Sequence, residues 1–189
     1  MKPFRRTEGR IAVLDRPDVD TDQIVPKQFL KRIERTGFGE FLFFDWAKQP
    51  QFELNRPEAR GATILVTGRN FGCGSSREHA AWALQDAGFE VVVAPSFGDI
   101  FRTNCLQVGL LPVVLPEEQA KALAAQGSGA ELAVDLEEQA IGPYYFEFDP
   151  FERHRLLEGL DDVDLTLRHE DEIAAFETAR PSPIATTAL

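Results

Sequence analysis

Cysteine is scarce in this sequence: the 189 residues include only Cys73 and Cys105, which form no CxxC pair. A disulfide-stapled fold, or a zinc or iron–sulfur site built by one chain, needs more cysteines at closer spacing. We therefore expect neither a disulfide framework nor a metal bound by this chain. Any metal that the function requires would have to come from elsewhere.

Positive charge is also in short supply. Twenty Lys and Arg stand against 31 Asp and Glu, which gives a formal net charge of -11. Phosphate backbones and anionic lipids are bound through clustered Lys and Arg, so nucleic acid and membrane partners are disfavoured. No apolar run reaches the roughly 20 residues that span a bilayer, and the start, Met1–Arg6, lacks the apolar stretch of a signal peptide. We expect a cytoplasmic protein.

Apolar residues are plentiful, at 43% of the chain with fifteen Phe, so a folded globular protein is expected. A chain of this length fits one domain, which buries roughly 70% of the surface of its unfolded chain. The last residues are rich in Pro, Ser and Thr and have little to bury. We predict one domain over residues 1–180 and a tail over residues 181–189.

Short apolar runs alternate with helical patterns along the middle of the chain. Alternation at these spacings predicts an α/β fold with a mainly parallel sheet layered with helices. Residues 23–46 show no clean period, and we expect loop with short helix there. The predicted strands are 10–15, 62–67, 89–94, 111–115, 131–135 and 144–149, and the predicted helices are 75–87, 96–108, 117–126, 150–160 and 171–179.

Two of these helices carry sequence signals at both ends. Gly88 and Gly109 stand where a C-terminal glycine belongs. Ser75 with Glu78, and Ser96 with Asp99, have the spacing of a capping box, in which a serine hydroxyl accepts from the amide three residues on. This pattern predicts that the helices begin at the two serines.

The most informative residues follow the second predicted strand, in the run GCGSSREHA over residues 72–80. The glycines Gly72 and Gly74 let the backbone approach a ligand, and the free amides of a helix start attract an anion. The hydroxyls of Ser75 and Ser76 and the guanidinium of Arg77 stand at the same point, and a guanidinium holds a carboxylate with two parallel hydrogen bonds. The run predicts a carboxylate-binding site.

The residues alone leave alternatives open. Ser75 and Glu78 fit a purely structural capping box as well as a site. His79 is either a base for Ser75 or a packed residue, and Cys73 is either a reactive thiol or a small packing residue. A P-loop is not indicated because no Lys precedes Ser75, and a nucleophile elbow is not indicated because no Gly stands two positions after either serine.

The run Gly74–Ala80 resembles the signature of the aconitase swivelling-domain family. Supporting segments have the spacing of bacterial isopropylmalate dehydratase small subunits, and the likeness covers roughly residues 5–180. The resemblance implies a single swivelling domain of layered β/β/α type. The supporting segments are DTDQIVP at 20–26, FLKR at 29–32, PSFGDIF at 95–101, Asn104 and GLLP at 109–112.

The resemblance also implies a function. It is that of a hydro-lyase small subunit in leucine biosynthesis, which interconverts 2- and 3-isopropylmalate through 2-isopropylmaleate. The partner is a large subunit whose own cysteines hold a [4Fe–4S] cluster, a Lewis acid for the substrate. Ser75 corresponds to the base, and Ser76 and Arg77 to carboxylate ligands. Asp22 matches an active-site aspartate of the family, although it also suits an ordinary turn or cap.

The substrate is less well specified. Residues 29–33 match the family's substrate-selecting loop, in which an apolar surface accepts a branched alkyl group and a cation accepts a further carboxylate. The loop carries both kinds of residue, so homoaconitate, a methylmalate or citrate are alternative substrates, and a non-catalytic carboxylate-binding domain is a different class of alternative. The apolar candidates are Phe29, Leu30 and Ile33, and the cationic ones are Lys31 and Arg32.

Overall fold

The computed structural model describes residues 1–31 and 35–179. The chain divides into two compact units, Met1–Gly159 and Leu160–Leu189. The predicted domain of residues 1–180 stays a prediction, and the predicted tail lies outside the described residues. No helix in the described ranges is long and apolar enough to cross a membrane.

The first unit is built around one seven-stranded sheet in the order β4-β3-β2-β1-β5-β6-β7. The strands β1 to β4 run parallel, and β5, β6 and β7 extend the sheet antiparallel from β1. A mainly parallel central sheet is therefore confirmed. The strands are β1 (Arg6–Leu14), β2 (Ile64–Thr67), β3 (Val91–Ala94), β4 (Leu111–Val114), β5 (Glu131–Asp135), β6 (Ala140–Ile141) and β7 (Tyr144–Tyr145).

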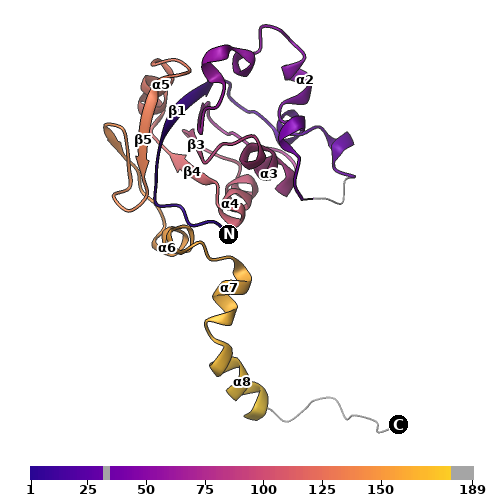
Figure 1. Ribbon diagram of the computed structural model, residues 1–189, viewed down its shortest axis with the longest axis vertical. Helices are drawn as coiled ribbons and strands as arrows, with labels where there is room; N and C mark the ends of the chain where they lie inside the picture. Colours follow the sequence, from indigo (N-terminus) through magenta and orange to yellow (C-terminus); the bar gives the residue numbers. More distant parts are fainter. Residues whose placement is uncertain (32–34, 180–189) are drawn as a thin grey trace. The chain divides into compact units, whose positions relative to one another are not determined.

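Strand β1 joins the two parts of the sheet. Its second half, from Ile11 to Leu14, pairs with β2 in parallel, while its first half, from Arg6 to Arg10, pairs with β5 antiparallel. The strand thus begins in the antiparallel part of the sheet and continues into the parallel part, as Figure 1 shows. The β5–β7 ribbon and α5 (Glu117–Ala124) lie on one side of the parallel strands, and α3 (Glu78–Asp86) and α4 (Asp99–Val108) lie on the other.

The strands β2 and β3 are buried on both faces, which explains why they read as unbroken apolar runs. Leu65 and Val92 face one core, with residues of α3 and α4. Ile64 and Val91 face a second core, with residues of α5 and β5. The sheet therefore separates two cores, and this gives the expected layered arrangement.

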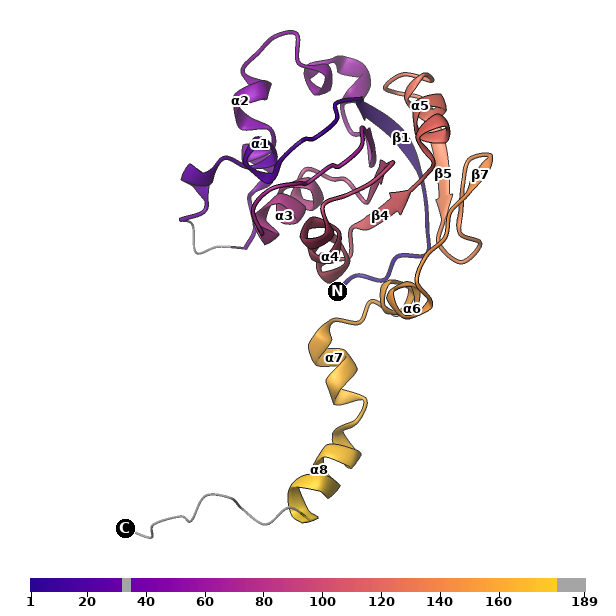
Figure 2. The same cartoon turned by 180° about the vertical axis from the view of Figure 1, so that it is seen from behind.

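In the described part of the segment between β1 and β2 the helices are short, as expected for residues 23–46. Phe38 and Phe43 are buried there and anchor the segment to the core of α3 and α4. Figure 2 shows from the rear that α1 lies between α2 and α3, and α1 contacts both. The elements are α1 (Thr21–Ile24), α2 (Phe44–Ala47) and the 3-10 turns Lys27–Phe29, Gly39–Phe41, Glu53–Asn55 and Pro57–Ala59.

The remaining helices lie near the end of the chain. α6 (Pro150–Glu158) belongs to the first unit, is N-capped by Asp149, and ends at Gly159. The second unit contains α7 (Asp162–Leu167), which was not predicted, and α8 (Glu170–Ala179), and neither has a buried residue. The predicted strand 144–149 is shorter, since β7 ends at Tyr145.

Both predicted capping boxes are wrong. α3 begins at Glu78 and α4 at Asp99, and no side-chain hydrogen bond caps either helix. The Ser96 hydroxyl instead accepts from the Asn70 amide, so it holds the preceding loop. The two C-terminal glycines are as predicted, since Gly88 and Gly109 follow their helices with φ of 98° and 85°.

Candidate active site

The candidate site is the loop over residues 68–77, which leads from the carboxyl end of β2 to the start of α3. The loop lies against the segment that follows β1. Its backbone bonds that segment at successive points: the Asp18 amide donates to the Arg69 carbonyl at 2.9 Å, and the Gly72 amide donates to the Val19 carbonyl at 2.8 Å. Since β1 and β2 are parallel neighbours, both segments leave the sheet at the same edge.

Gly72 is required by packing. It has a φ of 73°, and a Cβ there would lie 2.1 Å from the Cγ of Phe101 on α4. Only glycine satisfies both conditions. Its amide donates to the Val19 carbonyl and is therefore engaged within the protein. The close approach of the Gly72 and Gly74 backbone to an anion stays a prediction. Gly74, with a φ of 92°, is exposed.

Ser75 and Ser76 are both exposed, directly before α3. The Ser75 hydroxyl does not cap the helix, because the N-cap is Arg77 and its helix has no side-chain cap. The structural alternative for Ser75, a capping box with Glu78, is thereby excluded. The first turn of α3 keeps its positive end without a capping side chain.

Arg77 is held in place by Asp22 of α1. The guanidinium donates to both carboxylate oxygens, Nη1 to Oδ1 at 2.5 Å and Nη2 to Oδ2 at 2.8 Å. The Arg77 side chain is 12% exposed and that of Asp22 is 49% exposed. The hydrogen bond from Arg77 lowers the pKa of Asp22, and the charges of Arg77 and Lys27 lower it further against the effect of burial. Asp22 is therefore ionised at neutral pH.

The structure thus brings together four residues that the sequence singled out: Ser75, Ser76, Arg77 and Asp22. Residue 22 lies 55 positions before residue 77, and only the fold joins them. Asp22 is not the cap of its own helix, since Asp20 caps α1 through a capping box with Gln23. The alternative of an ordinary cap is therefore wrong for Asp22.

His79 is a packed residue. Its ring lies against Phe38 and Trp82, with centroids 5.0 Å and 4.7 Å away. Burial is the main cause that lowers the pKa of His79, while the Glu78 charge raises it and the Arg77 charge lowers it. His79 is neutral at pH 7 and forms part of the aromatic contact between α3 and the 3-10 turn after Phe38.

Cys73 is a thiol rather than a thiolate. Its pKa is raised by burial first, and then by the carboxylates of Asp20 and Asp18. These causes oppose the effect of a helix start, which lowers a thiol pKa. Of the two interpretations of Cys73, the packing residue is therefore favoured.

The substrate-selecting segment is described only in part. Phe29 and Leu30 are partly buried against the core of α3 and α4. The Phe29 ring stacks on Phe41 with centroids 4.1 Å apart. Lys31 is exposed, and Arg32 and Ile33 lie outside the described residues. The contact of these five residues with a substrate stays a prediction.

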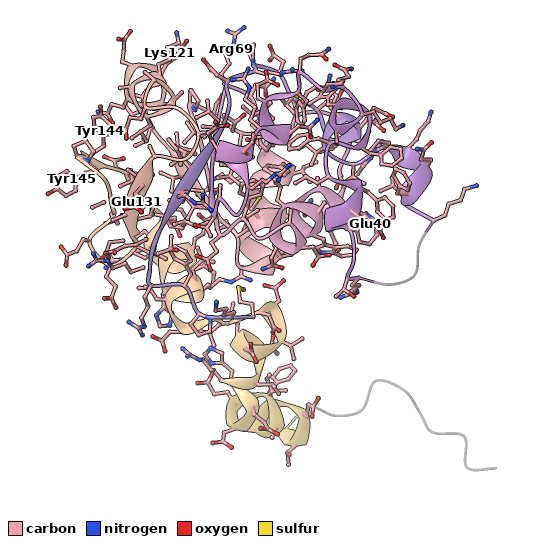
Figure 3. All side chains as sticks on the ribbon, turned by 45° about the horizontal axis from the view of Figure 1, so that its top comes forward. Glu40, Arg69, Lys121, Glu131, Tyr144 and Tyr145 are labelled. Carbon is pink, nitrogen blue, oxygen red and sulfur yellow. The ribbon has the colours of Figure 1, made fainter. Side chains whose placement is uncertain are left out.

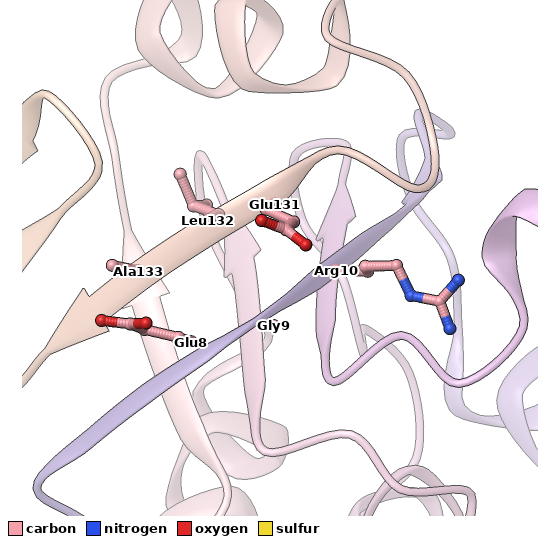
Figure 4. Close-up of a pocket in the computed structure, with 6 residues that line it drawn as sticks. All are labelled: Glu8, Gly9, Arg10, Glu131, Leu132 and Ala133. Atoms are coloured by element: carbon pink, nitrogen blue, oxygen red, sulfur yellow. The ribbon is translucent and has the colours of Figure 1, made fainter.

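Three cavities lie away from the serines. One, of about 420 Å³, is an open hollow over β1 and β5, lined by Glu8, Arg10 and Glu131 among others (Figure 4). A second, of about 290 Å³, lies between the residues at the start of β1 and those just before β3. A third, of about 270 Å³, lies at the carboxyl ends of the parallel strands and includes Arg69 and Lys121, labelled in Figure 3. None of the three is lined by Ser75, Ser76 or Arg77.

One residue of this arrangement was not singled out from the sequence. Thr21 is 2% exposed, and its hydroxyl donates to the Ser75 carbonyl of the loop over residues 68–77, called the serine loop below. Its place inside the run DTDQIVP was visible, but a threonine between two aspartates is also typical of an exposed turn. Only its burial distinguishes Thr21 from a residue of an exposed turn.

Comparison with known proteins identifies the class. Residues 1–118 match the model of the aconitase C-terminal domain. Residues 162–182 match the model of the C-terminal domain of the 3-isopropylmalate dehydratase small subunit. The site loop and the whole parallel sheet fall in the first match, so the fold class predicted from the sequence is confirmed.

Relatives of nearly the same length narrow the class to a family. The 3-isopropylmalate dehydratase small subunit of Geobacillus kaustophilus is 56% identical, over 94% of this chain and 96% of its own. That of Rubrobacter xylanophilus is 55% identical, over 96% of each. The crystal structure of 3-isopropylmalate dehydratase (leuD) from Methanocaldococcus jannaschii has a TM-score of 0.67 at 26% identity, over 91% of this chain and 99% of that one. The chain belongs to the family of 3-isopropylmalate dehydratase small subunits.

Proposed function

We propose that this chain is the small, serine-bearing subunit of a 3-isopropylmalate dehydratase, which interconverts 2- and 3-isopropylmalate in leucine biosynthesis. The observation that carries the proposal is the loop before α3, where two exposed serines stand beside a guanidinium fixed by a carboxylate. The family supports the choice of substrate.

Ser75 is the base in this proposal. In the dehydration, ionised Ser75 takes the proton from one carbon, and the electron pair of that C–H bond forms the double bond. The hydroxyl leaves the neighbouring carbon, where the partner's Lewis acid would accept it, and an unsaturated dicarboxylate remains. Rehydration returns the proton and the hydroxyl to the opposite carbons. The ionised form of Ser75 accepts the proton and later gives it back. Positive charge from Arg77 and from the start of α3 favours this ionised form, which is otherwise inaccessible at neutral pH.

Ser76 and Arg77 hold a carboxylate of the substrate. A guanidinium has five N–H donors, and the pair with Asp22 occupies two of them. The remaining donors are available to a second carboxylate. Because Asp22 fixes the guanidinium plane, the substrate meets a donor that is already oriented.

The proposed partner is a large subunit that holds a [4Fe–4S] cluster, in a cytoplasmic heterodimer or larger heteromer. This chain does not fit such a cluster by itself, because it has only two cysteines and family clusters need three. In the described ranges, no three His, Cys, Asp or Glu side chains form a metal site. The cluster supplies Lewis-acid chemistry from the partner's side, and Ser75, Ser76 and Arg77 supply the proton transfer and carboxylate binding.

The test is Ser75→Ala in the subunit pair reconstituted anaerobically. We expect kcat to fall about 10²- to 10⁴-fold, the usual contribution of an acid–base group. Ser76→Ala is the matched control, and it should raise KM more than it lowers kcat. Native mass spectrometry of both pairs separates lost chemistry from lost assembly. Near-wild-type turnover of an assembled Ser75→Ala pair would contradict the proposal.

The substrate is tested with a panel of 2- and 3-substituted malates on the same pair. The proposal expects the highest kcat/KM for isopropylmalate. Lys31 is the exposed cation of the described part of the selecting loop, and it favours a substrate with a further carboxylate. Preference for homoaconitate or citrate over isopropylmalate would therefore assign the chain to a related hydro-lyase.

A further inference from the structure

Thr21 bonds the serine loop twice. Its amide donates to the Cys73 carbonyl at 2.9 Å, and its hydroxyl donates to the Ser75 carbonyl at 2.8 Å. It is the first residue of α1 and 2% exposed, whereas Ser75 is exposed. The buried residue therefore anchors the exposed one.

The two bonds reach the loop on either side of Gly74. Gly74 has a φ of 92° and no side chain, so this is the point at which the loop backbone is freest to rotate. The Thr21 amide fixes the chain before it, and the Thr21 hydroxyl fixes the chain after it. A short parallel bridge between Asp20 and Cys73 supports the first of these contacts.

The hydroxyl is the contact that belongs to the Thr21 side chain alone. Any residue at position 21 except proline would keep the amide bond, but only serine or threonine would keep the bond to the Ser75 carbonyl. A branched residue without a hydroxyl would fill the same space and lose only that bond. The two functions of Thr21, packing and hydrogen bonding, can thus be separated by substitution.

We propose that Thr21 is a positioning residue, whose hydroxyl sets the backbone of Ser75 and hence the direction of the proposed base. The inference rests on the proposed function, since the position of Ser75 matters to turnover only if Ser75 acts in it. Asp22, the next residue, fixes Arg77. α1 therefore orients both the base and the carboxylate ligand, through adjacent residues with different partners.

The inference predicts that loss of the Thr21 hydroxyl lowers kcat and leaves KM nearly unchanged. Loss of the Thr21 hydroxyl leaves Arg77 bound to Asp22, so carboxylate binding is kept, while Ser75 loses its anchor. A displacement of about 1 Å in a reacting group lowers rates by roughly 100-fold. We expect kcat of Thr21→Val to fall about 10- to 100-fold, with KM changed less than about threefold.

The experiment uses the pair reconstituted with the large subunit and isopropylmalate. Thr21→Val is compared with Thr21→Ser, which restores the hydroxyl and should recover most of the wild-type kcat. Thr7→Val is the matched control. Thr7 lies on β1, away from the serine loop, and its hydroxyl donates to the Glu90 carboxylate at 2.6 Å. This substitution should leave kcat unchanged.

Amide exchange in the small subunit on its own gives a readout without activity. Thr21→Val should speed exchange of the two amides that bond these segments together, those of residue 21 and Gly72, and leave β2 and β3 protected. Thr21→Ala, which removes the hydroxyl without adding a buried methyl, serves if the valine variant does not fold. An unchanged kcat, or an equal loss in Thr21→Ser and Thr21→Val, would overturn the inference.

Ser75→Ala measured in parallel separates the two proposals. If Ser75→Ala is inactive and Thr21→Val retains wild-type kcat, the positioning role fails alone. If Ser75→Ala is fully active, the base assignment fails, and the positioning role fails with it.

Discussion

Asp22 and Arg77 form an ion pair between the segment after β1 and the serine loop. The pair is bidentate and charge-assisted, which makes it directional as well as attractive. We expect Asp22→Asn to raise KM on the order of tenfold, because Arg77 loses its orientation. Since Asp22 is half exposed and screened by solvent, stability should fall by only about 0.5–1 kcal/mol. Steady-state kinetics and thermal unfolding check the two effects.

Asp18→Asn is the control for that change. Asp18 accepts from the Asn70 side chain at 2.8 Å and lies in the same segment, but it does not touch Arg77. An asparagine keeps this acceptor, so KM should stay at the wild-type value. If Asp22→Asn instead lowered KM, Asp22 would compete with the substrate for Arg77 rather than orient it.

His79 makes the stability of the fold depend on pH. Burial lowers its pKa in the folded state, so the unfolded chain takes up the proton first as pH falls through about 6.5. Stability from the neutral ring is therefore complete above that pH and declines below it. We expect the fall in Tm from about pH 7 to pH 5 to be smaller by about 1–3 °C in His79→Phe, which keeps the contact with Phe38 and Trp82.

Calorimetry of both proteins at the two pH values measures that difference. The comparison is between slopes, because Asp and Glu also titrate in this range and contribute equally to both proteins. An identical slope for His79→Phe and the wild type would show that protonation of His79 costs nothing in the folded state.

At the scale of the elements, apolar periodicity predicted the parallel strands and the helices between them. β2 and β3 are buried on both faces, and this single physical condition makes the sequence signal strong. β6 and α7 were missed: β6 has two residues, and α7 has no buried residue to produce a period. The capping boxes were wrong because the helices begin at Glu78 and Asp99, after the two serines, which lie in the preceding loops. Ser75 is bonded through its carbonyl by Thr21, and Ser96 accepts from Asn70.

The candidate site was predicted from the sequence only in part. The serines and Arg77 are contiguous, so their sequence run was sufficient to identify them. Asp22 came from the family resemblance, and its contact with Arg77 needed the fold, because nothing local relates positions 22 and 77. Thr21 could be recognised only from its burial in the structure. Sequence reasoning thus predicted the chemical groups of the candidate site, while the structure shows which residues contact them.

At the scale of the whole molecule, both hydrophobic cores lie within the first unit. The last residues of the second core are Leu156, which is fully buried, and Leu157 beside it. The unit also closes on itself, since the Met1 ammonium donates to the Gly159 carbonyl at 2.9 Å. The second unit contributes no buried residue in α7 or α8, although it matches its own family model. We therefore expect the first unit to fold without residues 160–189, so that the role of the second unit can be tested apart from folding.

A chain that ends at Gly159 tests this separation. It keeps α6 with its Asp149 cap and its glycine end, so we expect cooperative unfolding with a Tm within about 3 °C of the full chain. A chain that ends at Phe148 is the matched control. It loses Leu156, whose removal from the core costs about 2–5 kcal/mol, and its Tm should fall by about 5–20 °C. A large fall for the longer truncation would mean that residues 160–189 stabilise the first unit. With a stable Gly159 truncation, any loss of turnover in the reconstituted pair would be due to assembly or catalysis, because folding has been measured independently.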